Sequence, residues 1–177
     1  MLLLTFEDHK PRIHPSVFLA KGSVVTGDVE IGEDSSIWYN TVIRGDIAPT
    51  VIGKRVSVQD NSTLHQSPNN PLILEDEVTV GHNAILHSCI VRRGALIGMG
   101  AIIMDRAEIG EDAMVAAGAL VPPGMKVPPR SLVVGNPAKV KRELTEADFK
   151  ELVRIRQSYV DKGKMYRMLE ESPLERV

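Results

Sequence analysis

An aliphatic residue recurs at every sixth position over most of this 177-residue chain, and this spacing limits the fold more than any other feature. The spacing continues to residue 133 with three irregular intervals. Two intervals are longer than six, by three residues after Ile43 and by four after Leu64, and the interval after Leu86 is one residue shorter. We refer to these residues as the repeat positions. They are Ile13, Leu19, Val25, Ile31, Ile37, Ile43, Ile52, Val58, Leu64, Leu74, Val80, Leu86, Val91, Ile97, Ile103, Ile109, Val115, Val121, Val127 and Val133.

A period of six fits neither an α-helix nor an isolated amphipathic strand, which need periods near 3.6 and 2. It fits a coil of three flat faces in which every sixth side chain points at the axis, and hexapeptide repeats of this kind indicate a parallel β-helix. The residue four places after a repeat position is usually small or β-branched, as at Ser35 and Ala84. We therefore predict an all-β solenoid of about seven coils, each of about eighteen residues and stacked at about 4.8 Å.

The chain divides into three segments. Residues 1–12 are expected to form a lead-in and cap, 13–135 the solenoid, and 136–177 a connector followed by a helix. Thr145 and Asp148 form a capping-box pattern before that helix, and Gly163 is expected to break or end it, with a shorter helical piece from Lys164 to Glu171 and a frayed tail after Pro173. An apolar stripe at helical spacing needs a surface to cover, either this chain's own coils or a neighbour's. Its members are Phe149, Leu152, Ile155, Tyr159 and Val160.

Charge and composition exclude some partners. The 21 lysine and arginine residues nearly balance the 23 aspartate and glutamate residues, without a basic run, so neither nucleic acid nor an anionic membrane is an expected partner. The apolar start from Met1 to Leu4 is too short for a signal peptide or membrane span, which predicts a cytoplasmic protein. The single cysteine, Cys89, cannot form an internal disulfide and is expected to be a buried thiol.

Two of the five histidines occupy equivalent places on successive coils. His65 follows Leu64 and His87 follows Leu86, and those repeat positions are one coil apart. The two side chains should therefore stack on one face at about 4.8 Å, close enough for two imidazoles to share a metal ion.

His82 belongs to the preceding face because it comes two places after Val80. It cannot easily reach the same ion within one chain. If a threefold axis runs parallel to the solenoid, however, that face meets the neighbour's His65 and His87, and three half-sites become three whole sites. Three imidazoles and an open position characterise a catalytic zinc, which lowers the pKa of bound water toward neutrality. The structural alternative is three unrelated polar side chains.

Other polar residues occupy corresponding positions on these faces of the solenoid. Arg44 follows Ile43 and so lies in the column of His65 and His87, whereas Gln59 and Asp60 follow Val58 on the face of His82. Arg44 of one chain and Asp60 of the next should then meet across the interface, where a guanidinium could hold a carboxylate. Taken alone, each is more often part of a surface or interfacial salt bridge.

The ordered motifs of the chain resemble the γ-class carbonic anhydrase family over nearly its whole length. They are Arg44-Gly45-Asp46, Gln59-Asp60-Asn61, His65, Gly81-His82-Asn83 with His87, Ile97-Gly98-Met99-Gly100-Ala101 and Gly135-Asn136-Pro137-Ala138. The resemblance implies a left-handed β-helix trimer that reversibly hydrates carbon dioxide to bicarbonate, with His65, His82 and His87 as metal ligands. By the same resemblance, Gln59 would orient the metal-bound water, Arg44 and Asp60 would pair between subunits, and Asp46 would support that pair.

The chain departs from the family pattern at the proton-transfer residues. Ile47 stands where the archetype has a glutamate, and the loop from Gln66 to Pro71 contains no carboxylate. Low, buffer-dependent activity is therefore expected. The resemblance to shorter relatives implies that Tyr159 reaches the site; the alternative is a plain core aromatic.

Two other functions remain open. A hexapeptide-repeat acyltransferase would use the same solenoid, one histidine as general base and acyl-coenzyme A between subunits, but would not need three histidines at these positions. A metal-holding trimer could instead serve as a thioesterase-like hydrolase or a non-catalytic subunit. Three imidazoles suit zinc, iron and cobalt alike, so the sequence favours zinc without selecting it.

Overall fold

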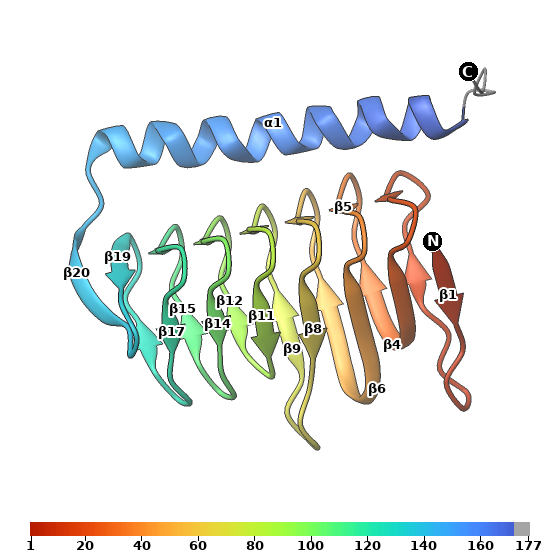
Figure 1. Cartoon of the computed structure of the whole chain (residues 1–177), viewed down its shortest axis with the longest axis horizontal. Coiled ribbons are helices and arrows are strands. Elements are labelled where there is room, and N and C mark those ends of the chain that lie inside the picture. The colour runs from red at the N-terminus through yellow and green to blue at the C-terminus, as the bar shows by residue number, and fades with distance from the viewer. Residues whose placement is uncertain (172–177) are drawn as a thin grey trace.

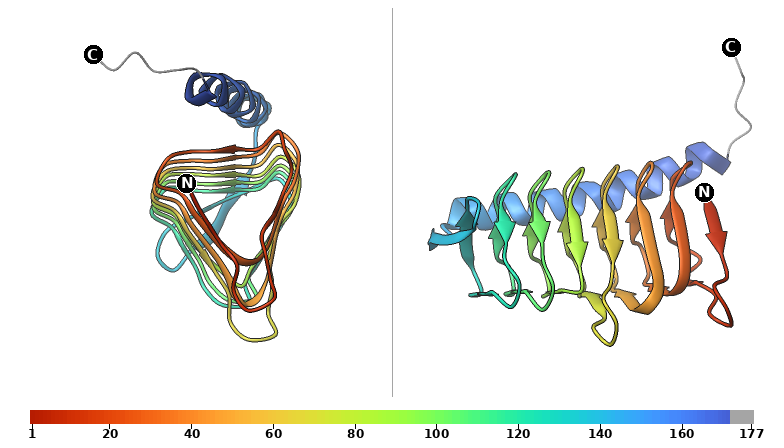
Figure 2. Two further views of the ribbon diagram at one scale, coloured as in Figure 1. Left: turned by 90° about the vertical axis from the view of Figure 1, so that its right-hand side faces the viewer. Right: turned by 60° about the horizontal axis from the view of Figure 1, so that its bottom comes forward.

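The computed structural model describes residues 1–171, and these form a parallel β-helix with one long helix beside it. The solenoid is a triangular prism when viewed along its axis (Figure 2). The elements are β1 (Leu2–Leu4), β2 (Arg12–Ile13), β3 (Phe18–Leu19), β4 (Val24–Ile31), β5 (Ser36–Ile37), β6 (Val42–Ile52), β7 (Ser57–Val58), β8 (Thr63–His65), β9 (Leu72–Leu74), β10 (Thr79–Val80), β11 (Ile85–His87), β12 (Ile90–Val91), β13 (Leu96–Ile97), β14 (Ile102–Ile103), β15 (Glu108–Ile109), β16 (Met114–Val115), β17 (Leu120–Val121), β18 (Lys126–Val127), β19 (Ser131–Val134), β20 (Lys139–Glu143) and α1 (Glu146–Glu171).

The predicted solenoid is confirmed by the sheet order. One sheet takes one strand from each coil in the order β3, β5, β7, β10, β13, β16 and β19, and β20 closes it antiparallel. The other two faces of the prism are joined into a second sheet because β4 and β6 run continuously around one corner (Figure 1). Parallel pairing in register therefore fixes the height of every side chain along the axis.

The core is a column of aliphatic side chains at the repeat positions. From Val25 to Val133 these side chains are at most 4% exposed, whereas Ile13 and Leu19 at the open end are only partly buried. The strand register follows the irregular intervals in the sequence. Ser36 pairs with Ser57, Ser57 with Thr79 and Thr79 with Leu96, so the coils stay aligned although they differ in length. Cys89 lies in this core, where burial raises its thiol pKa to about 12.

The corners explain the small residues between the repeat positions. At most corners, the residue three places after a repeat position has a left-handed backbone, as at Asn40 (φ 57°), Asn61 (φ 59°) and Asn83 (φ 58°). Asparagine tolerates this conformation better than most residues. The next residue turns inward under the corner and is fully buried, as are Ser62 and Ala84. A larger side chain there would have to displace the core.

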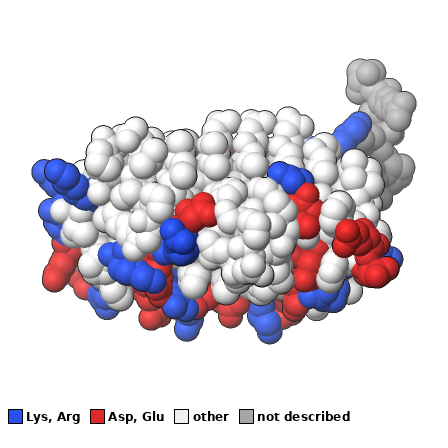
Figure 3. All heavy atoms as spheres, turned by 90° about the horizontal axis from the view of Figure 1, so that it is seen from below, with Lys and Arg blue, Asp and Glu red and all other residues white. Residues whose placement is uncertain are grey.

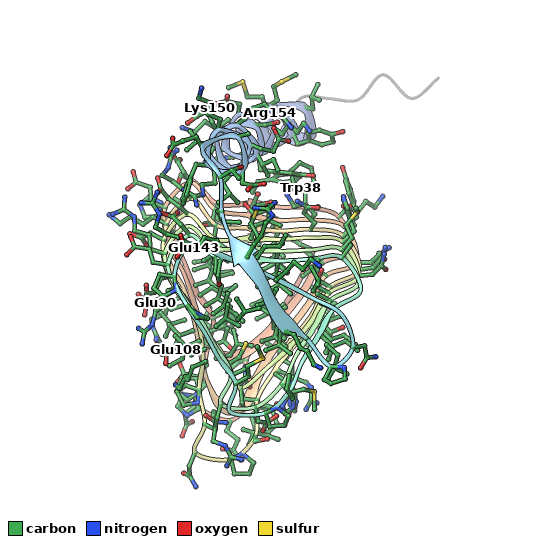
Figure 4. The ribbon with its side chains drawn as sticks, turned by 90° about the vertical axis from the view of Figure 1, so that its left-hand side faces the viewer. Glu30, Trp38, Glu108, Glu143, Lys150 and Arg154 are labelled. Carbon is green, nitrogen blue, oxygen red and sulfur yellow. The ribbon has the colours of Figure 1, made fainter. Side chains whose placement is uncertain are left out.

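The three outer faces differ in what they present to their surroundings. One is covered by α1, and a second carries a ladder of ion pairs in which Arg92 bridges Glu75 and Glu108 at 2.7 and 2.5 Å. Glu30 and Glu108 lie on this same side (Figure 4). Seen from below, the two signs of charge are interspersed (Figure 3). The third face, formed by the first half of β6 with β8, β11, β14 and β17, is the histidine face.

The terminal helix packs on its own coils. Its capping box is confirmed, because the Thr145 amide donates to the Asp148 carboxylate at 2.7 Å and the Asp148 amide donates to Thr145 Oγ1 at 3.3 Å. Leu152 and Val160 are buried, and Trp38 lies between the helix and the sheet beside Tyr159 (Figure 4). No helix within residues 1–171 has the length and apolar character needed to span a bilayer.

The expectation that Gly163 breaks this helix is wrong. The helix continues from Glu146 to Glu171, and Gly163 is buried within it. A Cβ at this position would lie 3.2 Å from Cβ of Ser36, so glycine permits close contact between the helix and the sheet. Packing therefore outweighs the low helix propensity of glycine. The tail predicted after Pro173 lies outside the described residues.

We predict that Gly163→Leu destabilises the fold by about 1 to 3 kcal/mol, because the added side chain pushes the helix away from Ser36. Chemical denaturation followed by Trp38 fluorescence would measure the loss. Lys150→Leu is the matched control, since Lys150 lies exposed on the same helix. Equal stability of the two variants would contradict the close-contact role of Gly163.

Candidate functional site

His65 and His87 face each other on the histidine face. They pair directly in register on β8 and β11, and His65 Nδ1 lies 3.2 Å from His87 Nε2. Two imidazole nitrogens bound to one tetrahedral zinc ion lie about 3.3 Å apart, because each Zn–N bond is about 2.0–2.1 Å long. The two rings are thus already spaced as two ligands of one ion.

Carboxylates hold the outer nitrogens of both rings. Asp46 Oδ1 lies 3.2 Å from His65 Nε2, and Asp105 Oδ1 lies 2.7 Å from His87 Nδ1. An ionised carboxylate only accepts hydrogen bonds, so it favours a proton on the ring nitrogen that it contacts. With the protons on the outer nitrogens, the inner nitrogens present lone pairs to each other, an arrangement that a cation between them would stabilise. Metal-binding histidines commonly have such a carboxylate behind them.

Both carboxyl groups are held in the charged form. Burial alone would raise the pKa of Asp46, but hydrogen bonds from Arg44 and from its own backbone amide lower it. Burial would likewise raise the pKa of Asp105, and hydrogen bonds from Ser67 and His87 lower it. The pKa of His65 is lowered, first by burial and then by the positive charge of Arg44, which outweigh the opposite effect of Asp46. Near pH 7 His65 is therefore neutral and can act as a ligand.

His82 stands apart from this pair. It occupies the corner after β10, and its Nδ1 lies 2.7 Å from Asp60 Oδ2, which leaves Nε2 free to bind. Within one chain, residues 1–171 contain no group of three His, Cys, Asp or Glu side chains placed to hold a metal ion. The three histidines therefore do not form one site within the described residues of a single chain.

The remaining predicted residues lie around these histidines. Arg44 Nη1 contacts Asp46 Oδ2 at 2.6 Å within the chain, so its pairing with Asp60 of a neighbour stays a prediction. Gln59 is buried, and with His82 and Tyr159 it lines a groove of about 430 Å³ between α1 and the sheet. Burial and the negative charge of Asp60 raise the pKa of Tyr159, which packs on Trp38 at a ring-centroid distance of 5.8 Å.

Sequence reasoning missed Asp105 and Ser67. Leu86 pairs in register with Ile103, so Asp105 lies one residue beyond the column of His87 and the column does not select it. Ser67 belongs to the loop from Gln66 to Pro71, which has no carboxylate of its own, and its hydroxyl donates to Asp105 Oδ2 at 2.5 Å. An acidic residue eighteen positions after a candidate ligand was the available signal.

Comparison with known proteins identifies the relatives of this chain. The family described as "Bacterial transferase hexapeptide (six repeats)" matches residues 10–45. A protein of Geobacillus kaustophilus named carbonic anhydrase is 62% identical over 96% of this chain and 93% of its own length. The mitochondrial gamma carbonic anhydrase 2 of Arabidopsis thaliana is 35% identical over 93% of this chain and 61% of its own length.

A solved structure is similar along the whole solenoid. It is a crystal structure of a Bacillus cereus protein described as an acetyltransferase, with a TM-score of 0.94 and 58% identity, and the match covers 95% of this chain and 98% of that one. The names of close relatives thus point to two different activities.

We predict that Arg44→Ala raises the pKa of His65 toward its ordinary value of 6.5, because a positive charge that opposes protonation is removed. Histidine NMR titration of the metal-free protein would measure it. The lowered pKa also means that the fold loses stability as the pH falls from 6.5 through the folded value, since the unfolded chain binds the proton more readily in that window. Arg44→Lys keeps the charge and should leave the pKa low; an unchanged pKa in Arg44→Ala would refute the assigned cause.

Proposed function

The chain belongs to the γ-class carbonic anhydrase family of hexapeptide-repeat proteins, and from this premise we propose that it catalyses the reversible hydration of carbon dioxide to bicarbonate. The observation that carries the proposal is the 3.2 Å separation of two imidazole nitrogens that face each other, His65 Nδ1 and His87 Nε2. Such a pair suits a shared metal ion. Neither a purely structural role nor a single general base requires it.

We propose that His65 and His87 of one subunit and His82 of its neighbour hold the ion. Zinc bound by three imidazoles supplies hydroxide near neutral pH by lowering the pKa of water. Iron or cobalt would fit the same three nitrogens. Each ring has its outer nitrogen on a carboxylate, of Asp46, Asp60 or Asp105, and this leaves one nitrogen of each ring to bind the ion.

A homotrimer is the proposed assembly, and the composition of the histidine face supports it. The outward side chains that pair in register along this face form an uncharged and largely apolar column. They are Val42, Thr63, Ile85, Ile102 and Leu120. Ile47 and Met99 are also 47% and 57% exposed in the single chain. An exposed apolar column of this kind, beside the histidine pair, favours association with a second copy.

The other site residues would position the reactants. We propose that Arg44 pairs with Asp60 of the next subunit, and that Asp46 supports Arg44 as it does within the chain. The buried Gln59 amide, beside His82 in the groove, would orient the attacking oxygen. Because its pKa is raised, Tyr159 stays protonated near neutral pH, so it can donate a hydrogen bond but cannot act as a base.

We propose that proton transfer out of the site limits the rate of hydration. Each hydration releases a proton, and positioned acid–base groups typically speed such transfers by about 10² to 10⁴. Ile47 is half exposed and the loop from Gln66 to Pro71 offers no carboxylate. Dissolved buffer would then accept the proton directly.

An acyltransferase is the second candidate, because the Bacillus cereus relative described as an acetyltransferase is 58% identical. Such an enzyme would not depend on a metal ion held by three histidines. A non-catalytic metal trimer is the third candidate. Metal content separates the acyltransferase from the other two, and a hydration assay separates those two from each other.

We predict slow, buffer-dependent carbon dioxide hydration by the metal-loaded protein. Stopped-flow assays with zinc, iron or cobalt across buffer concentrations would measure it, and the rate should rise with buffer. Fast turnover independent of buffer would mean that the chain carries its own proton acceptor. The absence of turnover with all three metals would reject the proposed activity.

A further inference from the structure

Asp105 connects the histidine pair to the loop from Gln66 to Pro71. Its two carboxylate oxygens have different partners, since Oδ1 lies 2.7 Å from His87 Nδ1 and Oδ2 accepts a hydrogen bond from Ser67 Oγ at 2.5 Å. Asp105 stands at the corner after β14, one coil beyond His87 and two beyond Ser67. One carboxylate thus links side chains from three successive coils.

The backbone around His87 is fixed by the same contacts. The Ser67 amide donates to Ser88 Oγ at 2.6 Å, and that hydroxyl donates to the Asn70 carbonyl at 2.7 Å. The Arg106 amide, next to Asp105, donates to the Ser88 carbonyl at 2.7 Å. Ser88 is buried and has a left-handed backbone (φ 43°). Ser88, the residue directly after His87, is therefore hydrogen-bonded both to the loop and to the coil that carries Asp105.

We propose that Asp105, held by Ser67, is a positioning residue that keeps His87 protonated on Nδ1 and its Nε2 directed at His65. A carboxylate accepts and never donates, so it selects this tautomer. Because Ser67 occupies the other oxygen, the carboxylate cannot turn away. The loop that lacks the family's carboxylate thereby has a different role, which is to anchor the Asp105 carboxylate two coils away.

The inference deepens the proposed function, since it depends on His87 being a ligand. Loss of a hydrogen-bond partner behind a ligating histidine typically weakens metal binding by about 10- to 100-fold. The variant Asp105→Asn could present either its side-chain oxygen or its amide NH₂ to His87, and so would no longer select one tautomer. Removal of the Ser67 hydroxyl leaves the contact with His87 but frees the carboxylate to rotate, so a smaller loss is expected.

The test uses the full-length protein without metal, labelled with ¹⁵N at histidine. In the wild type, the ring nitrogen shifts should report His87 protonated on Nδ1 alone. Asp105→Asn should give a mixture of tautomers, and zinc affinity measured by competition with a chelator should fall about 10- to 100-fold. Ser67→Ala should shift both readouts in the same direction by less.

Asp112→Asn is the matched control. Asp112 is 27% exposed against 25% for Asp105, and it pairs with Arg156 of the helix, away from the histidines. This variant should keep the wild-type tautomer and affinity. The proposal is overturned if wild-type His87 is protonated on Nε2, or if Asp105→Asn and Ser67→Ala bind zinc as tightly as the wild type. If Asp105→Asn does not fold, the His87 tautomer of the wild type and the zinc affinity of Ser67→Ala decide whether the proposal holds. None of these readouts needs turnover, so a failure of carbon dioxide hydration would leave them standing.

Discussion

Parallel hydrogen bonding between successive coils is the constraint on which the rest of the structure depends. It holds the coils in register, and the aliphatic column inside prevents a coil from slipping, since a shift of one residue would turn the core side chains outward. Residues far apart in the chain then share one height and one face. This register pairs His65 directly with His87, and their facing ring nitrogens lie 3.2 Å apart.

The same rigidity explains how the protein can hold two imidazole nitrogens facing each other at 3.2 Å. Two facing acceptors would repel, and in a flexible loop they would turn apart. Here the backbone of both residues is fixed in the sheet, and Asp46 and Asp105 hold the outer nitrogens. The free energy of folding thus supports an arrangement that becomes favourable when a cation is bound, which is how preorganised sites commonly work.

The solenoid and the histidine column could be predicted from the sequence because both depend on one spacing. The irregular intervals could be counted, so the register of His65 with His87 followed directly. Gly163 could not be interpreted correctly, because its close approach to Ser36 is a tertiary contact that propensity does not contain. Asp105 was missed because the corner offsets it by one residue from the column. The partner of Arg44 within the chain, Asp46, depends on how the side chain folds back, and spacing does not determine this.

Complementation between two inactive variants tests the central claim, that each site takes His82 from one chain and His65 with His87 from the next. His82→Ala and His65→Ala chains, each unable to form a site alone, are combined in equal amounts during assembly. In a closed ring of three, every mixed trimer contains one complete interface, so about one quarter of the wild-type zinc should survive a chelator wash. Zinc content no higher than that of the separate variants, or full zinc retention by His82→Ala alone, would contradict the shared site.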